Sequence, residues 1–211
     1  MNIPERVARV IDPPMESLNS RMVQLMARGE DVISLGQSVP WYGPPPEAVR
    51  AVSEELSGRR INVYSSDMGL PELRSALAGK LRSFNRVLAD PDTQIIITPG
   101  SNQAFMMAML TLVGPGDEVV LPSPYYFNHD MAVALCGAKA IYAPLAEEDG
   151  FQLHLHSIKP YLSPRTKAVV INSPNNPTGA VYRQHELAEI VRFLAERGIF
   201  VVSDEAYEAF C

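Results

Sequence analysis

Apolar residues in the second half of the chain occur in short unbroken runs, separated by polar loops and helical patterns. Runs such as AVVI and IFVV do not alternate with polar residues, which is typical of strands in a parallel sheet covered by helices on both faces. We therefore predict an α/β fold with a mostly parallel sheet. The predicted strands are residues 94–98, 118–121, 139–143, 167–171 and 199–203.

Helical patterns fill the intervals between these strands. Residues 184–197 show the clearest one, because Leu187, Ile190, Val191 and Leu194 share one helical face and Gly198 follows as a stop signal. Further helices are predicted at residues 18–28, 46–56, 102–113, 126–136 and 154–162. The proline-rich run SVPWYGPPPEAV predicts a division into an N-terminal arm with a small-domain segment, 1–45, and a partial large domain, 46–211.

Composition narrows the kind of ligand. A net charge of -6 and the lack of a basic cluster disfavour a nucleic-acid partner, so a small molecule is the better expectation. The two cysteines form no CxxC pair, which disfavours a disulfide framework or a structural zinc site. The N-terminus does not match a signal peptide, and no apolar stretch is long enough for a membrane span. We expect a cytoplasmic protein without metal or membrane partner.

Polar runs follow the predicted strands, namely TPGSNQ, PSPYYFNH, NSPNNPTG and SDEAY. Ligands of open α/β sheets bind beyond the carboxyl ends of strands, so these loops predict one composite pocket. Ser101, Asn102 and Gln103 open a helix whose first-turn N–H groups suit a phosphate. The alternative is that Ser101 or Asn102 only caps that helix. Neither a Walker loop nor GxGxxG is present, which disfavours a nucleotide.

Asp204 follows a wholly apolar strand, and a buried carboxylate needs a partner. A protonated pyridine nitrogen is one candidate, and a capping role toward the next helix is the alternative. His129 is positioned in the sequence to hydrogen-bond such a carboxylate, and Tyr126 to stack on a planar ring. Both are equally interpretable as packing against the sheet. NSPNNPTG is a rigid turn with fixed amide donors, or no more than a tight loop.

Taken together, these motifs resemble those of the class I/II aminotransferases, which are fold-type-I pyridoxal-phosphate enzymes. The resemblance runs from about residue 32 to the last residue and includes ISLGQSVP, YSSDMGLPELRSALA, TPGSNQAF, PSPYYFNH, NSPNNPTG and SDEAYE, in the order in which the family carries them. It implies the three-layer large domain of that family. It also implies a reaction that transfers an amino group between an amino acid and a 2-oxo acid.

The resemblance assigns roles around the cofactor ring. It implies that Tyr126 stacks on the pyridine and that Asn176 hydrogen-bonds the phenolic oxygen. Asp204 would pair with the pyridine nitrogen, with His129 behind it, and Tyr207 would also reach the phenolic oxygen.

The resemblance also assigns the phosphate site. Ser101, Asn102 and Gln103 would bind the phosphate, and Tyr64 would reach the phosphate of a neighbouring subunit, which implies a homodimer. The family usually has glycine at the position of Ser38, so Ser38 is expected to reshape the fit of the substrate.

The lysine that holds the cofactor covalently in this family falls beyond Cys211, so the resemblance predicts that this chain is inactive alone. Lys80, Lys139, Lys159 and Lys167 lie outside the four pocket loops and are expected to be surface groups. Two other functions stay open. One is a different pyridoxal-phosphate reaction, such as that of a lyase, decarboxylase, cyclase or oxidase. The other is a non-catalytic binding or dimerisation module.

Overall fold

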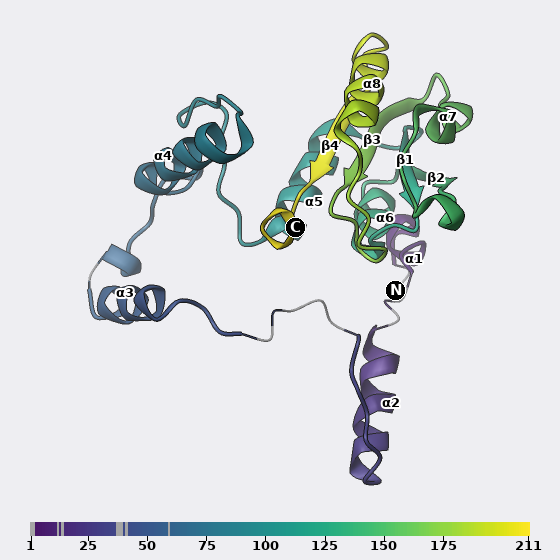
Figure 1. Ribbon diagram of the computed structural model, residues 1–211. Coiled ribbons are helices and arrows are strands. Elements are labelled where there is room, and N and C mark those ends of the chain that lie inside the picture. Colours follow the sequence, from purple (N-terminus) through teal and green to yellow (C-terminus); the bar gives the residue numbers. More distant parts are fainter. Residues whose placement is uncertain (1–2, 12, 14, 37–39, 41, 59) are drawn as a thin grey trace. The chain divides into compact units, whose positions relative to one another are not determined.

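The computed structural model describes residues 3–11, 13, 15–36, 40, 42–58 and 60–211 (Figure 1). Its helices are α1 (Glu5–Ala8), α2 (Met15–Ala27), α3 (Pro46–Leu56), α4 (Pro71–Lys80), α5 (Ser101–Leu112), α6 (Phe127–Leu135), α7 (Leu155–Ile158) and α8 (Gln184–Ala195). Its strands are β1 (Glu118–Ser123), β2 (Lys139–Pro144), β3 (Thr166–Asn172) and β4 (Phe200–Asp204). The short helical turns are η1 (Arg60–Asn62), η2 (Leu81–Asn85), η3 (Glu147–Asp149), η4 (Lys159–Tyr161) and η5 (Glu208–Phe210). Among the described residues, no helix is long and apolar enough to cross a bilayer.

The chain divides into two compact units, one comprising residues 1–12 and 99–211 and the other residues 13–98. The first unit contains a four-stranded, wholly parallel sheet with the order β2-β1-β3-β4. The unalternating apolar runs form these strands because both of their faces are buried. The predicted α/β fold is therefore confirmed, together with four of the five predicted strands. The predicted division at residues 45 and 46 stays a prediction.

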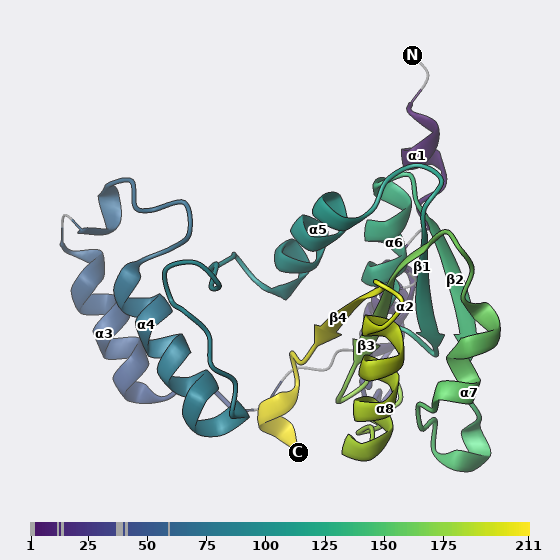
Figure 2. The same cartoon turned by 90° about the horizontal axis from the view of Figure 1, so that it is seen from above.

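Two apolar clusters cover the two faces of the sheet. On one face, α5 and α6 pack against inward residues such as Val119 and Val170. On the other face, α7 and α8 pack against Val120, Val169 and their neighbours, and Leu194 is fully buried there (Figure 2). Each cluster takes alternate residues of the same strands, so the sheet is the middle layer of three.

Helix α8 shows how the sequence sets its boundaries. Its apolar face is buried at Ile190 and Leu194, as the spacing predicts. Gly198 then adopts a φ of 67°, and the Ile199 N–H donates to the Leu194 carbonyl over 3.0 Å. This left-handed ending satisfies a free carbonyl of the last turn and releases the chain into β4.

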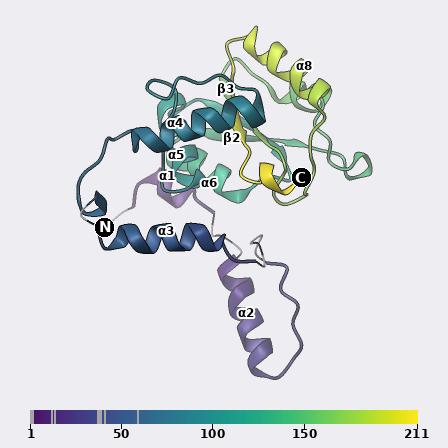
Figure 3. The same ribbon diagram turned by 60° about the vertical axis from the view of Figure 1, so that its left-hand side comes forward.

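The second unit contains α2, α3 and α4. Helix α2 is followed by an extended segment that returns beside it (Figure 3). Within this unit, the buried Arg74 of α4 joins the loops on either side of the helix, since its guanidinium donates to the carbonyls of Gly69 and Pro91 and pairs with Asp92 at 3.3 Å. One buried side chain thus fixes both ends of the α4 segment.

Three expectations from the sequence need correction. Residues 94–98 are not a strand, because no described strand pairs with them, and Ile97 N bonds instead to the Met68 carbonyl. The predicted helix at 154–162 is α7 followed by the separate turn η4, since Pro160 lacks the N–H that a continuous helix requires. Helix α4 and the π-helical turn η2 were not predicted as elements.

Candidate ligand-binding site

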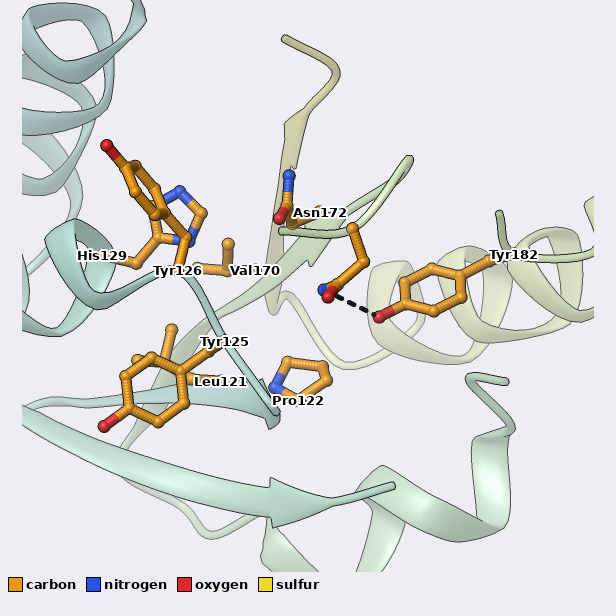
Figure 4. A pocket seen from close by; sticks show the side chains of 9 residues that line it. Leu121, Pro122, Tyr125, Tyr126, His129, Val170, Asn172 and Tyr182 are labelled. Carbon is orange, nitrogen blue, oxygen red and sulfur yellow. Dashed lines mark hydrogen bonds between the residues drawn. The ribbon is translucent and has the colours of Figure 1, made fainter. Parts of the chain in front are cut away.

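The carboxyl ends of β1 and β3 form the floor of a pocket in the first unit. From β1 the chain moves to β2 on one side of the sheet and later returns to β3 on the other side, so these two strand ends mark a topological switch point. The pocket there has a cavity volume of about 10 Å³ and is lined by residues that include Tyr125, Tyr126, His129, Asn172, Asn175 and Tyr182 (Figure 4). This volume is far below that of a small-molecule site, so these walls alone do not enclose a ligand.

Asp204, the last residue of β4, is the acidic group of the site. Its side chain is 14% exposed, and its Oδ2 lies 2.9 Å from Nε2 of His129, a buried residue of α6. The hydrogen bond from His129 holds the pKa of Asp204 below its ordinary value, against the opposing effect of burial. Because an ionised carboxylate only accepts, the hydrogen of this bond resides on Nε2. The predicted contact between His129 and Asp204 is confirmed.

Asp204 also makes a capping hydrogen bond, and His129 also packs in the core, as the alternative interpretations of the sequence predict. Oδ1 of Asp204 accepts from the Ala206 N–H at 3.1 Å, which is a local capping bond. The His129 ring stacks on Phe105 of α5, with centroids 4.2 Å apart. Packing therefore fixes the histidine, and the histidine fixes the carboxylate.

Tyr126 lies immediately before α6 and is half-buried. Its ring meets His129 edge to face, with centroids 5.4 Å apart at 87°, and its hydroxyl accepts from Asn128 Nδ2 at 2.7 Å. These two contacts restrict rotation of the ring. Stacking on a ring stays a prediction.

Asn176 stands in the NSPNNPTG turn after β3 and is half-buried. Its backbone N–H donates to Asn172 Oδ1 at 2.8 Å, and the turn is closed by Asn175 Oδ1, which accepts from the Thr178 hydroxyl at 2.8 Å. Asn175 Nδ2 also contacts the hydroxyl of the buried Tyr182 at 3.4 Å, and burial raises the pKa of Tyr182 to about 12. Asn172, Asn175 and Tyr182 were not singled out in the sequence, although the first two belong to the quoted motif.

Ser101, Asn102 and Gln103 form the exposed first turn of α5. Gly100, with a φ of 88°, is the N-cap, so neither Ser101 nor Asn102 is the capping residue considered above. The first bond of the helix runs from Ala104 N to the Gly100 carbonyl, which leaves the N–H groups of the three preceding residues without a partner inside the helix. Ser101 lies one turn before Phe105, the residue that stacks on His129.

Of the predicted residues, only Tyr126 and His129 line the pocket, so Asp204, Asn176 and the first turn of α5 are not part of its wall. The remaining predicted residues do not line it either. Tyr207 is half-buried and packs edge-on to Phe210, with centroids 6.2 Å apart. Tyr64 belongs to the second unit and is fully exposed. Ser38 lies outside the described residues.

The four lysines are not among the residues that line the pocket either. Lys139 and Lys167 stand at the amino ends of β2 and β3, opposite the pocket end of the sheet. Lys159 lies over the Phe193 ring at 5.7 Å, and Lys80 belongs to the second unit, where it bonds Asn85. None of them lines the pocket.

The fold and the site define a class: an α/β protein with a pocket at the switch point of a parallel sheet and an ionised carboxylate bonded to a histidine of the pocket wall. Sequence comparison sharpens this. The profile of the family described as aminotransferase class I and II matches residues 30–211. The chain therefore belongs to the class I and II aminotransferases.

Individual relatives agree with this assignment. The chain is 39% identical to a probable aspartate/prephenate aminotransferase of Aquifex aeolicus, over 97% of this chain and 52% of that protein. It is 40% identical to the aromatic-amino-acid aminotransferase 2 of Thermococcus litoralis, over 88% of this chain and 48% of that protein. The solved structure of a Thermus thermophilus aspartate aminotransferase double mutant matches with a TM-score of 0.92 and 33% identity, over 99% of this chain and 54% of that one. The chain thus spans about half the length of the relatives it matches.

Proposed function

We propose that this chain forms the pyridoxal-phosphate-binding part of an aminotransferase that moves an amino group between an amino acid and a 2-oxo acid. One observation carries the proposal: an ionised carboxylate, Asp204, is held by a buried histidine beside an aromatic ring at the switch point of the sheet. A protonated pyridine nitrogen is a partner that such a carboxylate stabilises.

The residues at the pocket suit the other groups of the cofactor. Tyr126 offers an aromatic face, and the Asn176 amide would donate to the phenolic oxygen, with Tyr207 as a second donor. The phosphate would accept from the first-turn N–H groups of α5 and the Ser101 hydroxyl, where the helix dipole favours an anion. Asn102 and Gln103 would add side-chain donors at the same turn.

Each protein group then has one task. Asp204 would hold a proton on the pyridine nitrogen, and His129 would keep Asp204 ionised and oriented. Tyr126 would fix the plane of the ring. The cofactor supplies an electron sink for the amino acid bound to it.

The substrates and partners are also part of the proposal. By name, the relatives act on aspartate, prephenate or aromatic amino acids. We extend to this chain only the class of amino acids and 2-oxo acids, with Ser38 as a residue that shapes the fit. We further propose that Tyr64 reaches the phosphate in a neighbouring copy, and that the lysine which holds the cofactor covalently is outside these 211 residues. We also propose that the protein resides in the cytoplasm, which is supported by two cysteines outside any disulfide.

Equilibrium dialysis of the chain against pyridoxal phosphate tests the proposal. We expect saturable binding of one cofactor per chain, which competes with pyridoxine phosphate and is weakened by Asp204→Asn. Binding that is equal in the wild-type chain and in Asp204→Asn would refute the proposed site. Asp117→Asn, at the amino end of β1 and therefore opposite the pocket end of the same sheet, is the matched control.

A further inference from the structure

Asn172, the last residue of β3, links two residues of the proposed cofactor site. It is buried, and its side chain lines the pocket (Figure 4). Its Nδ2 donates to the backbone carbonyl of Asp204 at 3.2 Å, and its Oδ1 accepts from the backbone N–H of Asn176 at 2.8 Å. These partners determine the orientation of the amide, since a carbonyl requires the NH₂ group and an N–H requires the oxygen.

The register of the sheet explains why one side chain can make both bonds. Asn172 is paired with Asp204 across β3 and β4, and the next residue, Ser173, also donates to the Asp204 carbonyl at 3.1 Å. Two donors from β3 therefore fix the end of β4 from which the Asp204 carboxylate projects. The bond to the Asn176 N–H fixes the first residue of the turn that Asn175 closes.

We infer that Asn172 is a positioning residue that sets the relation between the Asn176 amide and the Asp204 carboxylate. The inference rests on the proposed function and gives Asn172 no contact with the cofactor. A rigid pyridine ring carries its nitrogen and its phenolic oxygen at a fixed separation, so a displaced anchor loses its hydrogen bond or strains the other one. Asn172 acts on both anchors at once through their backbones.

The first test compares cofactor affinity with stability. Asn172→Ala removes both bonds, and we expect the affinity for pyridoxal phosphate, measured by fluorescence titration, to fall about tenfold, or about 1.4 kcal/mol. Leu194→Val is the control, because it loosens the apolar cluster on one face of the sheet and removes no hydrogen bond of the pocket. We expect this control to lower the melting temperature but to keep the affinity within about twofold.

The second test is a pH profile that a purely structural role would not produce. In Asn172→Asp, an ionised carboxylate still accepts from the Asn176 N–H but cannot donate to the Asp204 carbonyl, and it faces the Asp204 charge. When protonated, the same side chain mimics the amide, and burial beside a like charge favours protonation. The ratio of the affinities of Asn172→Asp and Asn172→Ala should therefore rise several-fold between about pH 8.5 and about pH 5.5. Titration of the cofactor phosphate and of Asp204 affects both variants and largely cancels in the ratio.

The outcomes separate the inference from the proposed function. A tenfold loss in Asn172→Ala, with recovery of Asn172→Asp in acid, supports the inference. Affinity of Asn172→Ala within twofold of wild type, or a ratio that does not change with pH, overturns it while the proposed function stands. If the wild-type chain binds no better than Asp204→Asn, the proposed function itself fails.

Discussion

The two ends of the parallel sheet each hold an acidic side chain, but they satisfy it in different ways. At the amino end, Glu118 begins β1 and is buried, with the Ser163 hydroxyl donating to Oε2 at 2.5 Å and the Arg165 guanidinium donating to Oε1. At the carboxyl end, Asp204 has one histidine and one backbone N–H as partners. Among the described residues, no lysine or arginine pairs with Asp204.

This difference indicates that Glu118 is a structural acid, which stabilises the fold, and that Asp204 is a binding acid, which is available to a ligand. Glu118 ties β1 to the segment that leads into β3, because Arg165 also accepts the Glu118 N–H through its backbone carbonyl at 2.9 Å. Both of its oxygens are engaged with a hydroxyl or a cation of the protein itself. Asp204 is held ionised and oriented, yet it lacks such a cation, so it retains the capacity to pair with a protonated group of a ligand.

The largest expected effect is on binding at the carboxyl end. Asp204→Asn should lower the affinity for pyridoxal phosphate about 10- to 100-fold, the loss of one charge-assisted bond of about 1.5–3 kcal/mol. The unfolding free energy should fall by less than this, because the amide oxygen can still accept from His129 and only the bond from the Ala206 N–H is lost. Fluorescence titration and urea unfolding of the same samples measure the two effects. A loss of stability that matches the loss of affinity would place Asp204 with Glu118 as a structural acid.

The opposite pattern is expected at the amino end. Glu118→Gln keeps the shape of the side chain but removes its charge toward Arg165, and it should lower the unfolding free energy by about 1–2 kcal/mol. Much of the arginine is exposed, which limits the effect. The affinity for pyridoxal phosphate should stay within about twofold. A strong loss of cofactor affinity in this variant would contradict the division between the two ends.

Lowering the pH should remove the contribution of Glu118 to the unfolding free energy. The Ser163 hydroxyl, and then Arg165, hold the pKa of Glu118 below its ordinary value. A lowered folded-state pKa means that the stabilisation is complete above the unfolded-state pKa of about 4.3 and is lost as the pH falls through the folded value. The stability difference between wild type and Glu118→Gln should therefore be constant near neutrality and shrink below about pH 4. A difference that grows in acid would be inconsistent with this assignment.

The stability contribution of His154, the residue before α7, should depend on pH with the opposite sign. His154 Nε2 lies 2.5 Å from Asp149 Oδ2, and its Nδ1 lies 2.9 Å from Glu186 Oε1, so both ring nitrogens face carboxylates. These bonds, Asp149 first, raise the pKa of His154. Its contribution is complete below the unfolded-state pKa of about 6.5 and is lost as the pH rises through the folded value. Wild type should therefore be more stable than His154→Gln in urea unfolding at neutral pH, and this difference should decline toward alkaline pH. A difference that increases there would refute the ion pairs of His154 with Asp149 and Glu186.

The smallest effect is expected for Tyr182→Phe. The hydroxyl of Tyr182 has one long contact, 3.4 Å from Asn175 Nδ2, and that amide also approaches the Pro124 carbonyl at 3.5 Å. We expect a loss of less than about 1 kcal/mol in unfolding free energy and an affinity within about twofold of wild type. A tenfold loss of affinity would show that the Tyr182 hydroxyl belongs to the binding site and not only to its wall.

The sequence predicted the central sheet because burial on both faces leaves an unmistakable apolar run, as in Ala168–Ile171. The same apolar signal led to a wrong strand prediction at residues 94–98. Ile95 is buried there without a partner strand, and an apolar run does not reveal whether a partner exists. Helix α4 escaped notice because most of its residues are exposed, so it has no broad apolar face to give a periodic signal.

The site was predictable to a similar degree. Asp204 and His129 carry a motif signal, and the bond between them follows from the proximity of strand ends. Asn172 belongs to the NSPNNPTG motif, but the motif does not reveal its role, because that role depends on the register that pairs it with Asp204, 32 residues later in the chain. Tyr182 was missed for a related reason, because it stands in the loop before α8 and its contact with Asn175 depends on the fold of that loop.

The central claim is that Asp204 receives the protonated ring nitrogen of pyridoxal phosphate, and nitrogen NMR of the bound cofactor tests it most directly. With the ring nitrogen labelled with ¹⁵N, the bound resonance in the wild-type chain should lie at the position of a protonated pyridine at mildly alkaline pH. In Asp204→Asn it should move toward the position of the unprotonated ring. A resonance that is unprotonated in the wild-type chain, or identical in both proteins, would contradict the account.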